Sequence, residues 1–260
     1  MSRTHTSRSS VGRALLGAAL AIVGVAVAAP ALASFDHGSW NRILQAHVDG
    51  EGKVAYRSLA EKDRPALDAY LQSLAEADPT AFADDQQRLA FWINAYNAVA
   101  VAGILAGYHA ESLFGRYRFC KSYESRVAGA DRTLDEIEHE IIRSTFDDFR
   151  VHFAVNCAST SCPVLRDEAY VGERLDAQLD DQAKRFLADP SRNRFSAEEG
   201  SAQLSKIFEW FAEDFTKQAS SLAAALAPYL DDRQRKLLES RPVRYLDYDW
   251  TMNAQAGQRP

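Results

Sequence analysis

The feature that most constrains the fold is a long apolar segment from Gln86 to Leu105. Two aspartates precede the segment and a glycine follows it, so the pattern predicts the longest helix of the chain. Asn94 and Asn97 lie three residues apart on one face of that helix, although asparagine is a poor helix former. If their amides are buried, they must find hydrogen-bond partners. They either bond neighbouring backbone and fix the core, or one of them orients a histidine or donates to an oxyanion.

The rest of the chain alternates short helices with a few extended segments. Apolar spacing and turn residues predict helices at about residues 40–50, 67–77, 133–143, 173–187, 208–215, 221–230 and 232–239. Extended segments are predicted at about residues 54–56, 149–155, 203–206 and 243–250. Residues 34–260 contain no internal repeat and no Pro/Gly/Ser-rich linker. We therefore predict a helix-rich α+β fold with a small sheet, built as a single globular domain over residues 34–260.

The first 33 residues have the layout of a secretory signal peptide. Met1–Ala33 begins with three arginines and no acid, continues with an apolar run from Ala14 to Ala29, and ends in Ala31-Leu32-Ala33 before Ser34. Sixteen apolar residues are few for a membrane span of about 20, and the small residues suit a cleavage site. We expect cleavage before Ser34, an exported protein in the periplasm or outside the cell, and no stable membrane anchor afterwards.

The charge balance narrows the class of partner. The chain has 30 Lys and Arg against 36 Asp and Glu, a net charge of −6 at pH 7, and no basic run. This acidic balance argues against a nucleic-acid partner and against anionic membrane surfaces. We expect a substrate or a protein as the partner, and no cofactor.

The segment from Val151 to Pro163 carries most of the reactive side chains. On the predicted strand His152 and Asn156 share one face, and Cys157 lies at the strand's exit. Pro163 suits the first position of a helix, which would place Cys162 at the helix cap. A thiol at a helix N-terminus loses its proton more easily, because the helix dipole stabilises the thiolate.

Three interpretations of these cysteines remain open. The four residues between Cys157 and Cys162 allow a disulfide, which the spacing favours, and with Cys120 the odd count leaves at least one thiol unpaired. A metal site would use His152 and both cysteines, and could add His139, but the paired cysteines of zinc sites are usually closer together.

The third interpretation is that Cys157 is a nucleophile, which His139 or His152 activates and which Asn94, Asn97 or Asn156 helps to orient. Glu138 and His139 are adjacent on the predicted helix and point about 100° apart, so they are not themselves a catalytic dyad. Either side chain can still face a site.

Four motifs in one order resemble a known family. They are Phe91–Asn97, Leu134–Arg143, His152–Pro163 and Tyr245–Asn253. With them the chain resembles an exported bacterial member of domain-of-unknown-function family 547 over nearly all of residues 35–253.

The family has no established reaction, and its pattern keeps a cysteine at the position of Cys157 more regularly than at Cys162. The resemblance therefore lowers the disulfide as a family-wide feature and favours Cys157 as the functional residue. From the residues themselves, our leading hypothesis is a thiol-dependent hydrolase or acyl transferase whose site resembles those of papain- or transglutaminase-type enzymes. Its candidate site residues are Cys157, His139 or His152, Glu138, Asn94 and Asn97. The alternative is a non-catalytic binding module in which the same residues form a polar core network.

Overall fold

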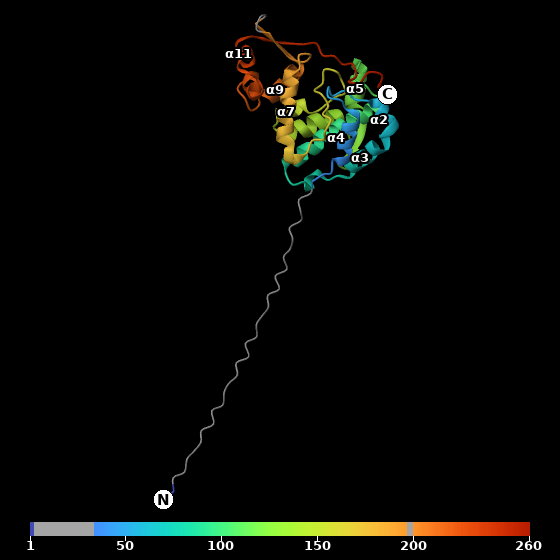
Figure 1. The fold of residues 1–260 in the computed structure, drawn as a ribbon, viewed down its shortest axis with the longest axis vertical. Coiled ribbons are helices and arrows are strands. Elements are labelled where there is room, and N and C mark those ends of the chain that lie inside the picture. Colours follow the sequence, from blue (N-terminus) through green and yellow to red (C-terminus); the bar gives the residue numbers. More distant parts are fainter. Residues whose placement is uncertain (3–33, 197–199) are drawn as a thin grey trace. The chain divides into compact units, whose positions relative to one another are not determined.

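The computed structural model describes residues 1–2, 34–196 and 200–260 (Figure 1). The predicted leader, with its apolar run and cleavage site, therefore falls almost wholly outside the described residues. From Ser34 onward the described residues belong to one compact unit. Its α-helices are α1 (Gly38–His47), α2 (Tyr56–Lys62), α3 (Arg64–Glu76), α4 (Asp85–Leu105), α5 (Leu113–Lys121), α6 (Arg143–Thr145), α7 (Leu175–Ala188), α8 (Ile207–Trp210), α9 (Ala212–Thr216), α10 (Leu222–Leu226) and α11 (Asp232–Ser240).

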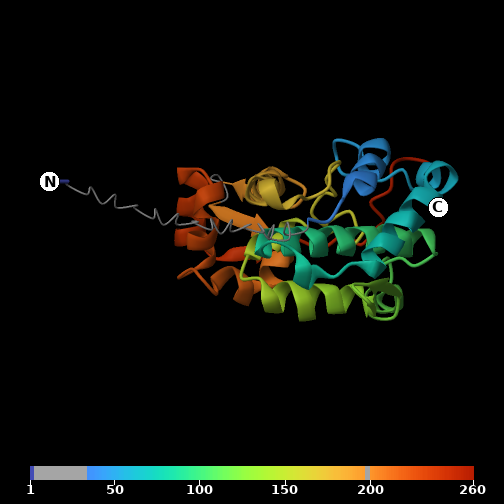
Figure 2. The same cartoon turned by 90° about the horizontal axis from the view of Figure 1, so that it is seen from below.

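Helix α4 is the centre of the larger hydrophobic core. The Asp84 side chain caps its start by accepting the Gln87 N–H at 2.8 Å. Every residue from Leu89 to Ile104 is buried, because α2, α3 and the π-helix η2 (Glu136–Ile142) pack on it (Figures 1 and 2). In the described part of the chain, α4 alone is long and apolar enough to cross a membrane. Since 89% of its apolar window is buried inside the protein, α4 also fits the role of a core helix.

A second, smaller hydrophobic cluster follows in the C-terminal part of the chain. It joins α7, α8, α9 and the three-stranded sheet of β3 (Arg194–Ser196), β4 (Ser201–Leu204) and β5 (Val243–Tyr245). In this sheet β3 pairs antiparallel with β4, and β4 pairs parallel with β5. A separate hairpin of β1 (Glu124–Val127) and β2 (Ala130–Thr133) packs against α3. The prediction of a helix-rich α+β fold is confirmed, with two small sheets in place of one.

Two local predictions next to the cysteines are wrong. Residues 149–155 do not form a strand; Phe149–Phe153 is a 3₁₀ helix, η3, whose first turn the Asp148 side chain caps by accepting the Arg150 N–H at 3.0 Å. The backbone after Pro163 is irregular up to the 3₁₀ turn η4 (Gly172–Arg174) that precedes α7. Cys162 therefore does not lie at a helix cap, and no helix dipole acts on its sulfur.

Candidate active site

Buried amides hold the backbone on either side of the cysteine loop, residues 156–162. The Asn97 Nδ2 donates to the Ala154 carbonyl at 3.0 Å, and its Oδ1 accepts the Asn156 N–H at 2.8 Å. Asn94 makes the same paired contacts with both backbone groups of Tyr170, at 2.7 and 3.0 Å. Each asparagine thus replaces a missing backbone partner, and both side chains are almost fully buried. Neither amide is directed at a histidine.

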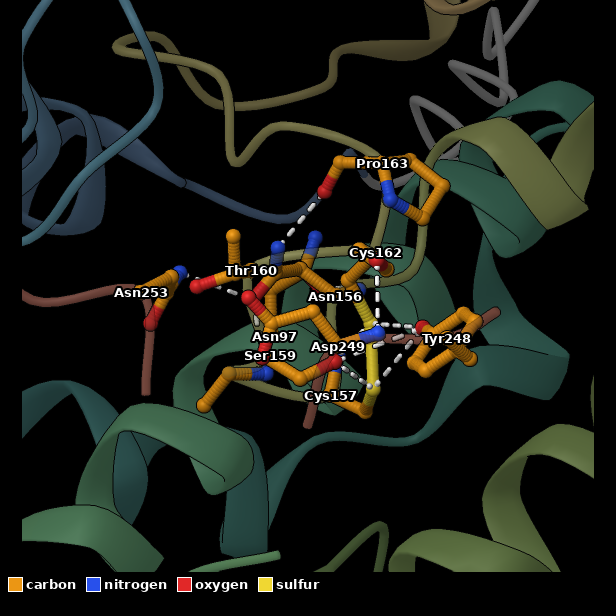
Figure 3. Close-up of a disulfide and its surroundings, with 12 residues drawn as sticks. Asn97, Asn156, Cys157, Ser159, Thr160, Cys162, Pro163, Tyr248, Asp249 and Asn253 are labelled. Carbon is orange, nitrogen blue, oxygen red and sulfur yellow. Dashed lines mark hydrogen bonds between the residues drawn. A yellow bond between two sulfur atoms is a disulfide. The ribbon is translucent and has the colours of Figure 1, made fainter. Parts of the chain in front are cut away.

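A second amide pair shapes the loop itself (Figure 3). The Asn156 Nδ2 donates to the Pro163 carbonyl at 2.6 Å, and its Oδ1 accepts the Ala158 N–H at 2.8 Å and the Asn253 Nδ2 at 3.2 Å. The Tyr56 hydroxyl donates in turn to the Asn253 Oδ1 at 2.7 Å. Ala158 has a φ of 59°, a conformation that non-glycine residues rarely adopt. The hydrogen bonds on both of its sides hold it there.

A disulfide between Cys157 and Cys162 closes the loop (Figure 3). The two Cα atoms are 6.3 Å apart, within the span that a disulfide bridges. Cys162 is buried, and its sulfur accepts the Cys157 N–H at 3.0 Å and the Tyr248 hydroxyl at 3.2 Å. Cys157 is only partly buried, and its sulfur lies 3.3 Å from the Ser159 hydroxyl. The Cys157 sulfur also lies 3.7 Å from the Tyr248 hydroxyl, so the two cysteines differ in burial rather than in the number of groups around their sulfurs.

His152 is held by a carboxylate that the sequence analysis missed. Its Nε2 lies 2.7 Å from the Oδ2 of Asp214 on α9, and its ring stacks on Phe211 with the centroids 4.0 Å apart. Arg143 also donates to Asp214, at 2.6 and 3.1 Å. The hydrogen bond from His152 and that from Arg143 hold the pKa of the Asp214 carboxyl well below its usual range. The carboxylate therefore stays ionised, and it lies against the Nε2 side of the imidazole.

One cavity of about 150 Å³ brings three of the predicted site residues together. Cys157, His152 and Glu138 line it, with the remaining wall supplied by Tyr96, Cys120, Val155, Cys162, Pro163, Ile207, Trp210, Phe211, Tyr248 and Trp250. We call it the Cys157 pocket. Its wall is mainly aromatic and apolar, and no hydrogen bond joins Cys157 to His152 or to any other histidine of the described chain.

The other predicted site residues lie elsewhere. Arg143 donates to the Nδ1 of His139 at 2.6 Å, and the His139 Nε2 lies 3.6 Å from Asp135, so this histidine faces a surface ion-pair cluster. Of the two candidate bases, only His152 reaches the Cys157 pocket. Within the described ranges no three His, Cys, Asp or Glu side chains are grouped so that they could hold a metal ion.

The third cysteine also lines the Cys157 pocket. Cys120 is the free thiol, and burial raises its pKa to about 12. It is therefore protonated at neutral pH and a poor nucleophile. The same wall holds Tyr96, whose pKa is raised well above its usual value by burial and, secondarily, by Glu138.

One family model matches part of the chain, and its description names no activity. Residues 80–187 match the model of the family described as "Protein of unknown function, DUF547", which supports the assignment to that family. The matched segment contains α4 and the cysteine loop, and it ends before Asp214 and Tyr248. No curated protein and no solved structure matches the chain.

Proposed function

We propose that the Cys157 pocket is the active site of a thiol-dependent hydrolase or acyl transferase. The observation that carries the proposal is that Cys157 and His152 line one cavity, while the Oδ2 of Asp214 lies 2.7 Å from the Nε2 of the His152 imidazole. A nucleophile, a base and a residue that orients the base are the parts of a catalytic triad. His139 has no place in this arrangement, and Asn94 and Asn97 act as residues that position the surrounding backbone.

The chemistry begins with reduction of the Cys157–Cys162 bond by an external dithiol. The dithiol's first thiolate attacks the more accessible Cys157 sulfur, the S–S bond breaks, and Cys162 leaves as a thiolate. The Cys157 N–H and the Tyr248 hydroxyl already point at the Cys162 sulfur, at 3.0 and 3.2 Å, and would stabilise its charge. The dithiol's second thiol then displaces Cys157, so that the dithiol is oxidised to a disulfide and both cysteines are reduced.

Acyl transfer follows at the freed sulfur. The Cys157 thiolate attacks the carbonyl carbon of an ester or amide and forms a thioester, and the leaving group departs with a proton from His152. Water or a second nucleophile then gives its proton to His152 and attacks the thioester, which releases Cys157. The aromatic wall formed by Trp210, Tyr248 and Trp250 suits an apolar acyl group.

A binding module without catalysis is the second candidate, and the disulfide itself favours it. Both sulfurs are bonded to one another, and the buried amides of Asn97, Asn156 and Asn253 all have partners. If the bond never opens in the folded protein, this network is structural and the pocket binds its ligand without covalent chemistry.

Alkylation by iodoacetamide separates these two candidates. The folded protein is treated with a mild dithiol and labelled from about pH 5 to about pH 9, and the modified residue is located by peptide mapping. A catalytic Cys157 should react well below the pKa of about 8.5 of a free thiol, while Cys120 serves as the slow internal control. Failure of Cys157 to react in the reduced, folded protein would rule out the hydrolase.

Three variants then test the base. Asp214→Asn keeps the shape of the side chain but removes the carboxylate charge beside His152, so the alkylation of Cys157 at low pH should slow down. His152→Ala should abolish the low-pH alkylation. His139→Ala is the comparison variant and should have a clearly smaller effect than His152→Ala, because His139 does not line the pocket and reaches Asp214 only through Arg143. If His139→Ala has the larger effect, His152 is not the base.

We also propose that the chain is exported. The signal-like layout of Met1–Ala33 supports this proposal, and so does the disulfide, since such bonds persist mainly in oxidising compartments. Reduction of Cys157 would then depend on a dithiol protein of the same compartment.

A further inference from the structure

Helix α5 exposes an apolar surface to solvent. Leu113, Phe114 and Tyr117 are 78%, 71% and 59% exposed, and they are three of the five large apolar side chains that stand out from the described surface. At 100° per residue they span an arc of about 100° on the helix. The residue that anchors α5 to the core, Phe119, points the opposite way and is fully buried. The helix therefore has a second apolar face that nothing in the described chain covers.

Positive charge borders this face. Arg116 and Arg118 lie on either side of the apolar arc, and Lys121 follows one turn later. Residues 112–123 contain no acidic residue. Lys121 pairs with Asp135 at 3.0 Å, whereas the two arginines make no ion pair with the described carboxylates. Their guanidinium groups lie over aromatic rings, that of Arg116 at 4.3 Å from the Trp250 centroid.

From this arrangement we propose that α5 docks the protein on an anionic lipid surface. Interfacial helices use these residue types, with Leu and aromatic side chains facing the lipid and Lys or Arg beside them. The net charge of the whole chain opposes such binding only at long range, because charges more than about 10 Å apart are largely screened at physiological salt. The local charge of α5 is positive, so it complements the lipid phosphates.

The contact between Arg116 and Trp250 connects this face to the Cys157 pocket. Trp250 lines that pocket, and its ring stacks with Trp210, which is 46% exposed. Docking through α5 would therefore bring the rim of the pocket close to the lipid. The docking itself does not depend on the chemistry proposed for Cys157.

Vesicle co-sedimentation tests the proposal. Both hydrophobic clusters lie within residues 35–254, so the chain from Ser34 contains its own core and can be used without the apolar run of the leader. Vesicles of phosphatidylcholine alone are compared with vesicles that contain an equal part of phosphatidylglycerol. We expect binding to the anionic vesicles, and a loss of about tenfold or more in affinity for the double variant Leu113→Gln and Phe114→Gln.

A pair of charge variants provides the matched control. Arg116→Gln with Arg118→Gln should weaken binding and reduce its salt dependence. Arg233→Gln with Lys236→Gln removes the same charge from α11, on another exposed helix, and should leave binding unchanged. The proposal is wrong if the unmodified protein does not bind anionic vesicles, or if the apolar double variant binds as well. Another outcome is that the unmodified protein self-associates without binding vesicles. If the apolar double variant abolishes that self-association, the face binds a second copy of the chain and the lipid proposal is wrong.

Discussion

Replacing Asn97 with leucine tests the role of the buried amides directly. The change keeps the size of the side chain but removes its donor and its acceptor. The Ala154 carbonyl and the Asn156 N–H would then lose partners at 3.0 and 2.8 Å in a site with almost no solvent access. No other group can reach these two backbone atoms unless α4 moves, because α4 is buried on all sides around Asn97.

The expected loss follows from those two groups. Each buried polar group that is left without a partner costs about 1–3 kcal/mol, and two groups are affected here. Burying leucine in place of an amide recovers part of that loss. We therefore expect the free energy of unfolding to fall by about 2–4 kcal/mol for Asn97→Leu. Asn94→Leu should cost a similar amount, since it leaves both backbone groups of Tyr170 without partners.

Urea denaturation followed by circular dichroism measures this loss. Gln72→Leu is the matched control, because that amide is exposed on α3 and bonds only Glu76; its effect should stay within about 0.5 kcal/mol. Asn97→Leu should also alter the alkylation rate of Cys157 in the reduced protein, while Asn94→Leu should affect it less. A loss below about 1 kcal/mol for both asparagines would refute the argument that their amides fix the core.

Three further predictions concern other parts of the chain. Burial lowers the pKa of His37 to about 4, so stability that is complete above the unfolded value of 6.5 should be lost as pH falls from there to about 4, by up to about 3 kcal/mol. Melting curves across this range should show that dependence, and His37→Gln should flatten it while still bonding Tyr70, 2.7 Å away. Gly103→Ala should cost about 1–3 kcal/mol in the same denaturation assay, because a Cβ would lie 2.7 Å from the buried ring of Phe119. Mass spectrometry of the exported protein should find Ser34 at the N-terminus, and an intact Met1 would contradict export by cleavage.

Predictions from the sequence succeeded where one local signal dominated. The start of α4 depends on a capping aspartate and its body on an unbroken apolar run, and both are visible in the sequence. The helix predicted from residue 133 also has a local start signal, a capping box: the Glu136 carboxylate accepts the Thr133 N–H at 2.7 Å, and the Thr133 hydroxyl accepts the Glu136 N–H at 3.2 Å. The π-helical turn that follows has no comparable local signal.

The strand predicted at residues 149–155 failed for a tertiary reason. Its alternating pattern fits a strand with one buried face, but Val151, His152 and Phe153 are all buried. Val151 packs in the larger cluster and Phe153 in the smaller one, so this segment lies between two cores and is covered on every side. A 3₁₀ turn can direct consecutive side chains to different cores, and the sequence pattern alone could not reveal that requirement.

The partners of the site residues could not be predicted from local sequence patterns, because they lie far away along the chain. His152 contacts Asp214 across 62 positions, and the Cys162 sulfur accepts from Tyr248 across 86. The cysteine loop is further tied to Asn253, 97 positions from Asn156. None of these contacts repeats at a spacing that a helix or strand would impose.

These large separations in sequence also determine how much of the chain the site geometry needs. The segment that matches the family model, residues 80–187, contains the candidate nucleophile and base but not Asp214, Tyr248 or Asn253. Without Asp214 the ring of His152 loses the carboxylate that orients it, and without Asn253 the amide of Asn156 loses one of its partners. Because these groups are far apart in sequence, the loop acquires its geometry only when both hydrophobic clusters have formed. If the proposed site is correct, it therefore needs the compact part of the chain from Ser34 onward, and residues 80–187 alone would be expected to carry an ordinary, unoriented thiol.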